Sequence, residues 1–216
     1  KSLTFIGLLT GLISSVMLMG VRFVTLLAIL LLLSCLLYSY SYIYKRKFLV
    51  GNIIVSVSVA FAVFLPWLFE SFHLSNNALI LSACKETMMN ILPFVLIYTA
   101  FAFLTTLIRE IVKDAEDYNG DSVTRCRTIP VVCGMLKTKI IVGVLFFVLY
   151  VFLAYFHWVL LIMQADIAIY IMIVTETLCI MLMPILFKIK EFADFHRLSI
   201  VLKMIMVVGM LTMVFI

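Results

Sequence analysis

The chain has 216 residues, of which 66% are hydrophobic and only 12% are charged, and its mean hydropathy is +1.27. This composition excludes a water-soluble enzyme, a disordered tail and a secreted disulfide scaffold. The formal net charge of +5 would suggest nucleic-acid binding in a soluble protein, but in a membrane protein basic residues gather at the cytoplasmic ends of helices. We therefore predict an integral, multi-pass membrane protein that binds no nucleic acid.

Long hydrophobic segments follow one another along the chain, each near the 20 or so residues that a membrane-spanning helix needs. They run from Leu3 to Gly20, Phe23 to Tyr44, Phe48 to Leu68, Asn77 to Ile108, Ile140 to Leu161, Ile167 to Phe187 and Ser199 to Ile216. A backbone in hydrocarbon must satisfy its own hydrogen bonds, and uninterrupted runs without alternation exclude a barrel. The predicted fold class is all-α, a polytopic bundle with seven transmembrane spans in a single domain over residues 1–216.

The basic residues indicate how the bundle is oriented. All of the 16 Lys and Arg residues except Arg22, Lys85 and Lys203 fall on one side when the connection after the fourth span is placed in the cytoplasm. This asymmetry is what the positive-inside rule requires. We therefore predict that the long connection of residues 109–139 is cytoplasmic, and its length suggests a functional role.

This connection is also acidic. It contains five of the eleven Asp and Glu residues of the chain: Glu110, Asp114, Glu116, Asp117 and Asp121. Because nothing before Asn119 and Gly120 interrupts the pattern, we expect the fourth helix to continue beyond the bilayer and to stop at Gly120.

On such a helix, Asp114, Asp117 and Asp121 would lie on one face. Three carboxylates on one face repel one another unless a cation lies between them, and ligands that are all oxygen suit Mg²⁺. The sequence therefore predicts a Mg²⁺ site at these three aspartates, which would be both the metal ligands and the catalytic residues.

Basic residues flank the aspartates, with Arg109 and Lys113 before them and Arg125 and Arg127 after them. Carboxylate-bound Mg²⁺ with guanidinium groups nearby is a set of groups that can hold a diphosphate. Because only hydrocarbon lies behind this site, we expect the ligand to be a polyprenyl diphosphate, whose ionisation leaves an allylic carbocation for a hydrophobic acceptor. The alternative from the residues alone is a solvated surface with pairs of opposite charge at i,i+4 spacing.

Three stretches resemble the UbiA superfamily of intramembrane prenyltransferases. The second aspartate-rich motif of that family is similar to the stretch Arg109-Glu-Ile-Val-Lys-Asp-Ala-Glu-Asp-Tyr-Asn-Gly-Asp121, followed by Arg127-Thr-Ile-Pro130. In sequence, this stretch resembles the digeranylgeranylglyceryl phosphate synthase branch most. The stretch Tyr40-Ser-Tyr-Ile-Tyr-Lys-Arg-Lys-Phe-Leu-Val-Gly-Asn52 is similar to the tyrosine-to-lysine segment of the family, and Asp194-Phe-His-Arg-Leu-Ser-Ile-Val-Leu-Lys203 to the stretch before its last helix.

The resemblance implies a Mg²⁺-dependent transfer of a polyprenyl group from its diphosphate to a lipid or aromatic acceptor in lipid or quinone biosynthesis. Geranylgeranylglyceryl phosphate is one candidate acceptor. It implies that Asp114, Asp117 and Asp121 bind Mg²⁺. It also implies substrate contacts from five residues: Tyr40, Lys45, Arg109, Lys113 and Arg127.

The chain departs from the family pattern at its beginning. Members of the family have nine spans and two acidic motifs, whereas the spans here resemble the third to the ninth. The chain begins with Lys1 and not with Met, so we expect an N-terminally incomplete prenyltransferase domain that lacks the first two helices and the first motif. With half of the metal ligands absent, the chain alone should be nearly inactive.

The remaining polar residues leave alternatives open. Glu176 lies deep in a span, where ionisable residues are costly, and it either binds the acceptor or bonds to a neighbouring helix. His157 is expected at the membrane interface and His196 at the surface. The alternative function is a noncatalytic transporter or channel with an acidic cytoplasmic loop, although a transporter should place ionisable groups along a path at mid-membrane.

Overall fold

The computed structural model describes residues 21–42, 48–189 and 192–216, and within them every regular element is helical. The helices are α2 (Val21–Tyr42), α3 (Val50–Leu74), α4 (Ala78–Glu116), α5 (Tyr118–Val123), α6 (Ile129–Cys133), α7 (Met135–Met163), α8 (Asp166–Lys188) and α9 (Phe192–Leu211), followed by the 3₁₀ turn η2 (Thr212–Val214). The predicted all-α helix bundle is confirmed. The first predicted span, Leu3 to Gly20, lies outside the described residues.

Five of the described helices are long and apolar enough to cross a membrane. They are α3, α4, α7, α8 and a helix spanning Asp194–Val214, which is α9 with its 3₁₀ extension, and they correspond to the last five predicted spans. α2 covers most of the second predicted span and contains the shorter apolar stretch Leu27–Tyr38. An integral membrane protein follows from these helices, while the number of spans remains a prediction.

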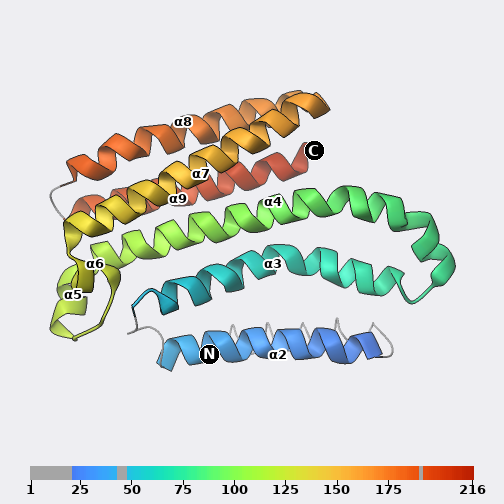
Figure 1. Cartoon of the computed structure of the whole chain (residues 1–216), viewed down its shortest axis with the longest axis horizontal. Coiled ribbons are helices and arrows are strands. Elements are labelled where there is room, and N and C mark those ends of the chain that lie inside the picture. Colours follow the sequence, from blue (N-terminus) through green and yellow to red (C-terminus); the bar gives the residue numbers. More distant parts are fainter. Residues whose placement is uncertain (1–20, 43–47, 190–191) are drawn as a thin grey trace.

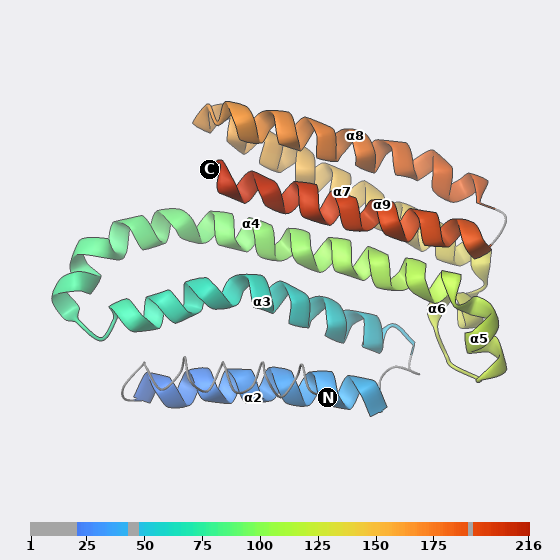
Figure 2. The same cartoon turned by 180° about the vertical axis from the view of Figure 1, so that it is seen from behind.

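Helix α4 forms the axis of the bundle. It packs against α3 on one side and against α9 and α7 on the other, while α2 contacts α3 and α8 contacts α7 and α9. Figures 1 and 2 show this order from opposite sides, with the long helices roughly parallel and α5 and α6 together at one end. The segments that carry the acidic motif are therefore confined to one end of the molecule.

The length of α4 carries its last turns out of the membrane. Its 39 residues would extend about 58 Å at 1.5 Å per residue, whereas the hydrocarbon core of a bilayer is about 30 Å thick. Residues 87–108 contain no charged side chain and are long enough to span that core. The segment from Arg109 to Glu116 consequently lies beyond the membrane-spanning part of α4.

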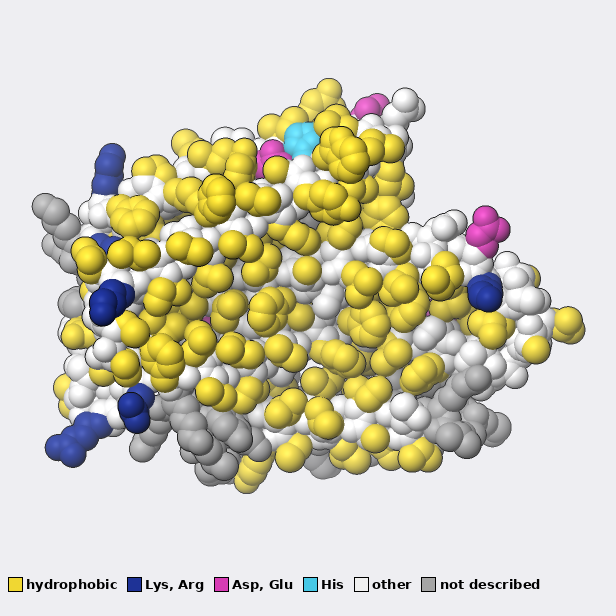
Figure 3. All heavy atoms as spheres, in the orientation of Figure 1, with side chains coloured by type: hydrophobic (Ala, Val, Ile, Leu, Met, Phe, Trp, Pro, Cys, Tyr) yellow, Lys and Arg dark blue, Asp and Glu magenta, His cyan; other side chains and the backbone are white. Residues whose placement is uncertain are grey.

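The buried core lies among α4, α7, α8 and α9. Ile108, Phe146, Leu160, Leu186 and Leu202 are fully buried there, and Phe101 packs against Gly209 of α9. Large apolar side chains also cover the outside of the helices, as expected for contact with lipid tails. Figure 3 shows these side chains over the middle of the molecule and most of the visible Lys and Arg side chains at one end.

The predicted continuation of the fourth helix to Gly120 is wrong. α4 ends at Glu116, and Asp117, with φ −83° and ψ 8°, separates it from the short helix α5, in which Gly120 lies. Asn119 and Gly120 are helical within α5, but their low helix propensities contribute little to a continuous helix across Asp117. The loop after α5 contains Arg125 with φ 54°, and Gly134 with φ 82° separates α6 from α7. The expected single face of three aspartates is therefore divided between two helices.

Candidate functional site

The three predicted metal ligands lie at one end of the bundle but differ in their surroundings. Asp114 is half-buried in the last turn of α4, Asp117 is exposed at the junction with α5, and Asp121 is half-buried on α5. Among the residues that the structure describes, no three His, Cys, Asp or Glu side chains come together as a ready-made metal site. The helix break thus leaves the aspartates as neighbours without gathering all three around one point.

Asp114 is the most constrained of the three. The side-chain amide of Asn52, in the first turn of α3, donates a hydrogen bond of 2.8 Å to its Oδ2 atom. The pKa of Asp114 is raised to about 6, chiefly by burial and also by the carboxylates of Asp121 and Glu110, while the bond from Asn52 and the charge of Lys113 act in the opposite direction. Negative charge at Asp114 is therefore incompletely balanced by the protein, and a bound cation would favour its ionised form.

Asn52 is a site residue to which sequence reasoning assigned no role. In the sequence it is only the last residue of the Tyr40–Asn52 stretch, and its contact could not be predicted because its partner Asp114 is 62 positions away along the chain. Only the packing of α3 against α4 shows that the amide reaches the carboxylate. The signal available in the sequence was a polar residue at the start of an otherwise apolar helix.

Arg109 and Glu110 form an ion pair at the membrane end of the site. The Nη1 atom of Arg109 lies 3.1 Å from Oε1 of Glu110, whose side chain is only 11% exposed. The alternative drawn from the sequence, a solvated surface with i,i+4 pairs, does not describe this pair, because its members are adjacent and Glu110 is buried.

Three polar atoms near this end are buried and have no hydrogen-bond partner within the described residues. They are Nε of Arg109 and the hydroxyl groups of Thr106, on α4, and Thr128, at the start of α6. A buried donor without a partner is costly, about 1–3 kcal/mol. All three can donate hydrogen bonds, so an anionic ligand or ordered water at this end of the bundle could satisfy them.

The remaining predicted substrate-binding residues are less constrained. Lys113 and Arg127 are exposed, and Lys113 lies close enough to Asp114 to influence its charge. Lys45 lies outside the described residues, and nothing is described of the side chain of Tyr40. The roles predicted for these four residues remain predictions.

A second polar contact links α9 to the end of α4. Nδ1 of His196 lies 2.9 Å from Oε1 of Glu116. The sequence predicted a solvated surface position for His196, and the residue is indeed exposed. Its partner could not be predicted, because Glu116 is 80 positions away along the chain.

Glu176, deep in α8, bonds to a neighbouring helix. Its Oε1 lies 3.0 Å from Nδ1 of His157 on α7, and neither side chain is more than one-fifth exposed. Of the two alternatives for Glu176, the structure shows the bond between helices. The expected position of His157 at the membrane interface remains a prediction.

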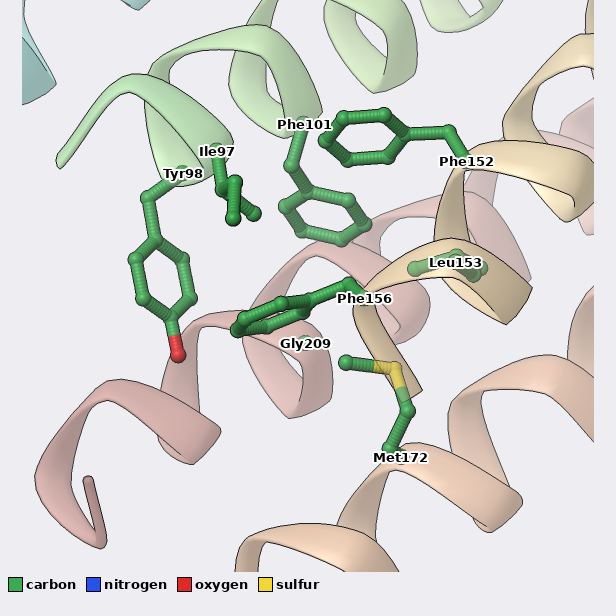
Figure 4. Close-up of a pocket in the computed structure, with 8 residues that line it drawn as sticks. All are labelled: Ile97, Tyr98, Phe101, Phe152, Leu153, Phe156, Met172 and Gly209. Carbon is green, nitrogen blue, oxygen red and sulfur yellow. The ribbon is translucent and has the colours of Figure 1, made fainter. Parts of the chain in front are cut away.

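A small enclosed pocket lies among four of the described helices. Figure 4 shows a pocket enclosed by side chains of α4, α7, α8 and α9, among them Phe101, Phe156 and Met172. Its volume is about 10 Å³, which is at the lower limit for one water molecule. This pocket is a packing defect and is far too small for a prenyl chain.

Comparison with known proteins identifies a family that matches most of the chain. Residues 1–196 match the model of the UbiA prenyltransferase family.

Two similar curated proteins are digeranylgeranylglyceryl phosphate synthases. The protein from Saccharolobus solfataricus is 34% identical over 94 residues, covering 44% of this chain and 28% of the relative. The protein from Sulfurisphaera tokodaii is 32% identical over 160 residues, covering 72% of this chain and 50% of the relative. The chain thus spans half or less of the length of these relatives, and no solved structure gave a significant match.

Proposed function

Because the chain belongs to the UbiA prenyltransferase family, we propose that it transfers a polyprenyl group from a polyprenyl diphosphate to a hydrophobic acceptor within the membrane. The observation that carries the proposal is the half-buried Asp114 at the membrane-exit end of α4, whose charge is opposed by burial and by neighbouring carboxylates. Such a group is suited to bind a cation. Family membership favours this enzyme over the alternative of a noncatalytic transporter or channel.

Asp114, Asp117 and Asp121 are the proposed ligands of Mg²⁺. Carboxylate oxygens are the donors that Mg²⁺ prefers, and this metal usually takes only one or two carboxylates, with water and substrate phosphate oxygens completing its shell. The donor set therefore fits, even though the three side chains are not gathered in advance. When bound, Mg²⁺ would neutralise the charge that develops on the departing diphosphate.

The basic and hydroxyl groups of the chain are the proposed diphosphate contacts. Arg109, Lys113 and Arg127 supply positive charge, and the unpartnered donors of Arg109, Thr106 and Thr128 can bond to phosphate oxygens. Breaking the bond between the first prenyl carbon and oxygen sends its electron pair to the diphosphate and leaves an allylic cation. The acceptor then bonds to that carbon and loses a proton.

The acceptor proposed for this chain is a glyceryl phosphate lipid. Two similar curated relatives are digeranylgeranylglyceryl phosphate synthases, and the acidic motif resembles that branch most. A geranylgeranylglyceryl phosphate acceptor would be held with its phosphate at the membrane surface, on the side of the aspartates. We place this side in the cytoplasm, as the distribution of Lys and Arg suggests.

The test is prenyl transfer by the full-length protein in membranes, followed with an isotopically labelled prenyl diphosphate. We expect Asp114→Asn and Asp117→Asn each to lower the rate by about 100-fold or more, because a neutral amide is a poor Mg²⁺ ligand. Chelation of divalent metal should have the same effect. The matched control is Asp166→Asn, which changes an exposed aspartate in the first turn of α8 at the opposite end of the bundle. Undiminished transfer in either site variant would contradict the proposal.

A further inference from the structure

A groove opens between the last turns of α8 and the first turns of α9, outside the site formed by α4 and α5. It has a volume of about 340 Å³ and is lined by Leu182, Ile185, Lys188, Ile189, Asp194, Arg197, Leu198 and Val201. This volume is in the range of sites that bind small molecules. The sequence and the proposed reaction assign no role to it.

The lining of the groove is divided by polarity. Its floor is formed by Leu182, Ile189 and Leu198, which are all nearly inaccessible, whereas Lys188 and Arg197 are exposed at its edge. Lys188 is the last residue of α8 and the first charged residue after Glu176 on that helix. The groove therefore lies where a helix leaves the hydrocarbon, with its apolar part toward the lipid tails.

The charges at the edge favour an anion. Among the described residues that line the groove, the only acid is Asp194, which lies 3.9 Å from Arg197 in an exposed pair, and such pairs are weak. Lys139, at the start of α7, donates a hydrogen bond to the carbonyl oxygen of Ile189. This bond satisfies one of the free carbonyl groups at the end of α8 and offsets the negative end of the helix dipole.

We propose that this groove binds an anionic glycerophospholipid from the surrounding leaflet. The phosphate contacts Lys188 and Arg197, and one acyl chain lies over Ile185, Leu198 and Val201. Basic pockets between transmembrane helices are suited to anionic headgroups. The apolar floor favours a lipid over a free phosphate ion, because only the lipid has a hydrocarbon chain to bury there. The proposal is independent of prenyl transfer.

The test uses the full-length protein in bilayer discs of phosphatidylcholine, with a small fraction of a phosphatidylglycerol probe that carries a photoreactive group on its acyl chain. After illumination and digestion, the labelled peptides are identified by mass spectrometry. We expect labelling within residues 182–201, and about five-fold less of it for each of Lys188→Gln and Arg197→Gln, because each basic residue contributes a similar attraction to an anionic headgroup.

The matched control is Lys137→Gln, which removes an exposed lysine at the same end of the bundle, in the first turn of α7, and should leave labelling unchanged. Val201→Trp fills the apolar part without changing the charge and should also lower labelling. Helix content and thermal unfolding identify variants that fail to fold. Equal labelling by a phosphatidylcholine probe, labelling elsewhere, or unchanged labelling in both charge variants and in Val201→Trp would overturn the proposal.

Discussion

Asp114 is held by another helix, whereas Asp117 and Asp121 belong to the junction and the short helix that follow it. The bond from Asn52 fixes one carboxylate oxygen of Asp114 and leaves the other available. A second residue that orients a metal ligand often matters as much as the ligand itself. Asn52 is therefore a positioning residue within the proposed site. A positioning role changes the Mg²⁺ requirement of the reaction, which a residue that only stabilises the fold would leave unchanged.

We expect Asn52→Ala to raise the Mg²⁺ concentration that gives half-maximal transfer by about ten-fold, because the carboxylate of Asp114 loses its orientation. The measurement is a Mg²⁺ titration of transferase activity in the full-length protein. Ser58→Ala is the control, since Ser58 lies on the same helix and donates only to the carbonyl of Ile54. A normal Mg²⁺ requirement in Asn52→Ala would show that the bond has no positioning role.

At the scale of elements, two side-chain contacts join neighbouring helices of the bundle. Gly209 allows α9 to approach α4 so closely that an added Cβ would overlap the ring of Phe101. Small residues at such contacts are typical of membrane helices, since close packing replaces the hydrophobic driving force. The bond between His157 and Glu176 links α7 to α8 in the same bundle.

We expect Gly209→Ala to destabilise the bundle by about 1–3 kcal/mol, because the ring of Phe101 is buried and must move. Thermal or denaturant unfolding in detergent measures the effect. Gly143→Ala is the matched control, because its added Cβ would crowd only the ring of Phe187, which is exposed and free to shift, and would make an ordinary van der Waals contact with Leu186. Equal stability of the two variants would contradict this account of the contact between α4 and α9.

A double-mutant cycle with His157→Phe and Glu176→Leu should give a coupling energy of about 0.6–2 kcal/mol, the range for hydrogen bonds between membrane helices. The same unfolding measurement applies. Thr177→Val combined with His157→Phe serves as the control cycle, because Thr177 bonds only to the carbonyl of Ile173 on its own helix. A coupling energy near zero for the first cycle would mean that the bond contributes nothing to helix association.

On the scale of the whole molecule, the groups proposed for catalysis and for lipid binding lie at the same end of the bundle. α4 ends there, α5 and α6 lie there, and α8 and α9 form the groove there. The opposite end contains the connections between α3 and α4 and between α7 and α8. The orientation of the bundle thus decides from which side of the membrane Mg²⁺ and the charged headgroups of the substrates reach the proposed catalytic site.

Cysteine labelling tests this orientation. Variants that keep only Cys84, near the start of α4, or only Cys126, in the loop after α5, are treated with a membrane-impermeant thiol reagent in intact cells and in inverted vesicles. We expect Cys126 to react only in the vesicles and Cys84 only in the cells, because most Lys and Arg lie on the side of Cys126. The reverse pattern would overturn the predicted orientation.

The amino-acid sequence alone was enough to predict the long apolar helices α2, α3, α4, α7, α8 and α9, although not the short helices α5 and α6. A long apolar run in hydrocarbon must form its hydrogen bonds internally, so composition and length determine the type of element without reference to its neighbours. The extension of α4 beyond the bilayer and the collection of acidic residues at one end follow from the same pattern. The family resemblance seen in the acidic motif is likewise a property of the sequence.

Only the tertiary structure decided how the side chains meet. The break at Asp117 divides the aspartates between α4 and α5, although helical spacing predicted one face. The contacts from Asn52 to Asp114 and from His157 to Glu176 join residues on different helices. Their partners depend on which faces the helices turn toward each other, and this is determined by close packing, as at Gly209 and Phe101, which hydropathy along the chain does not encode.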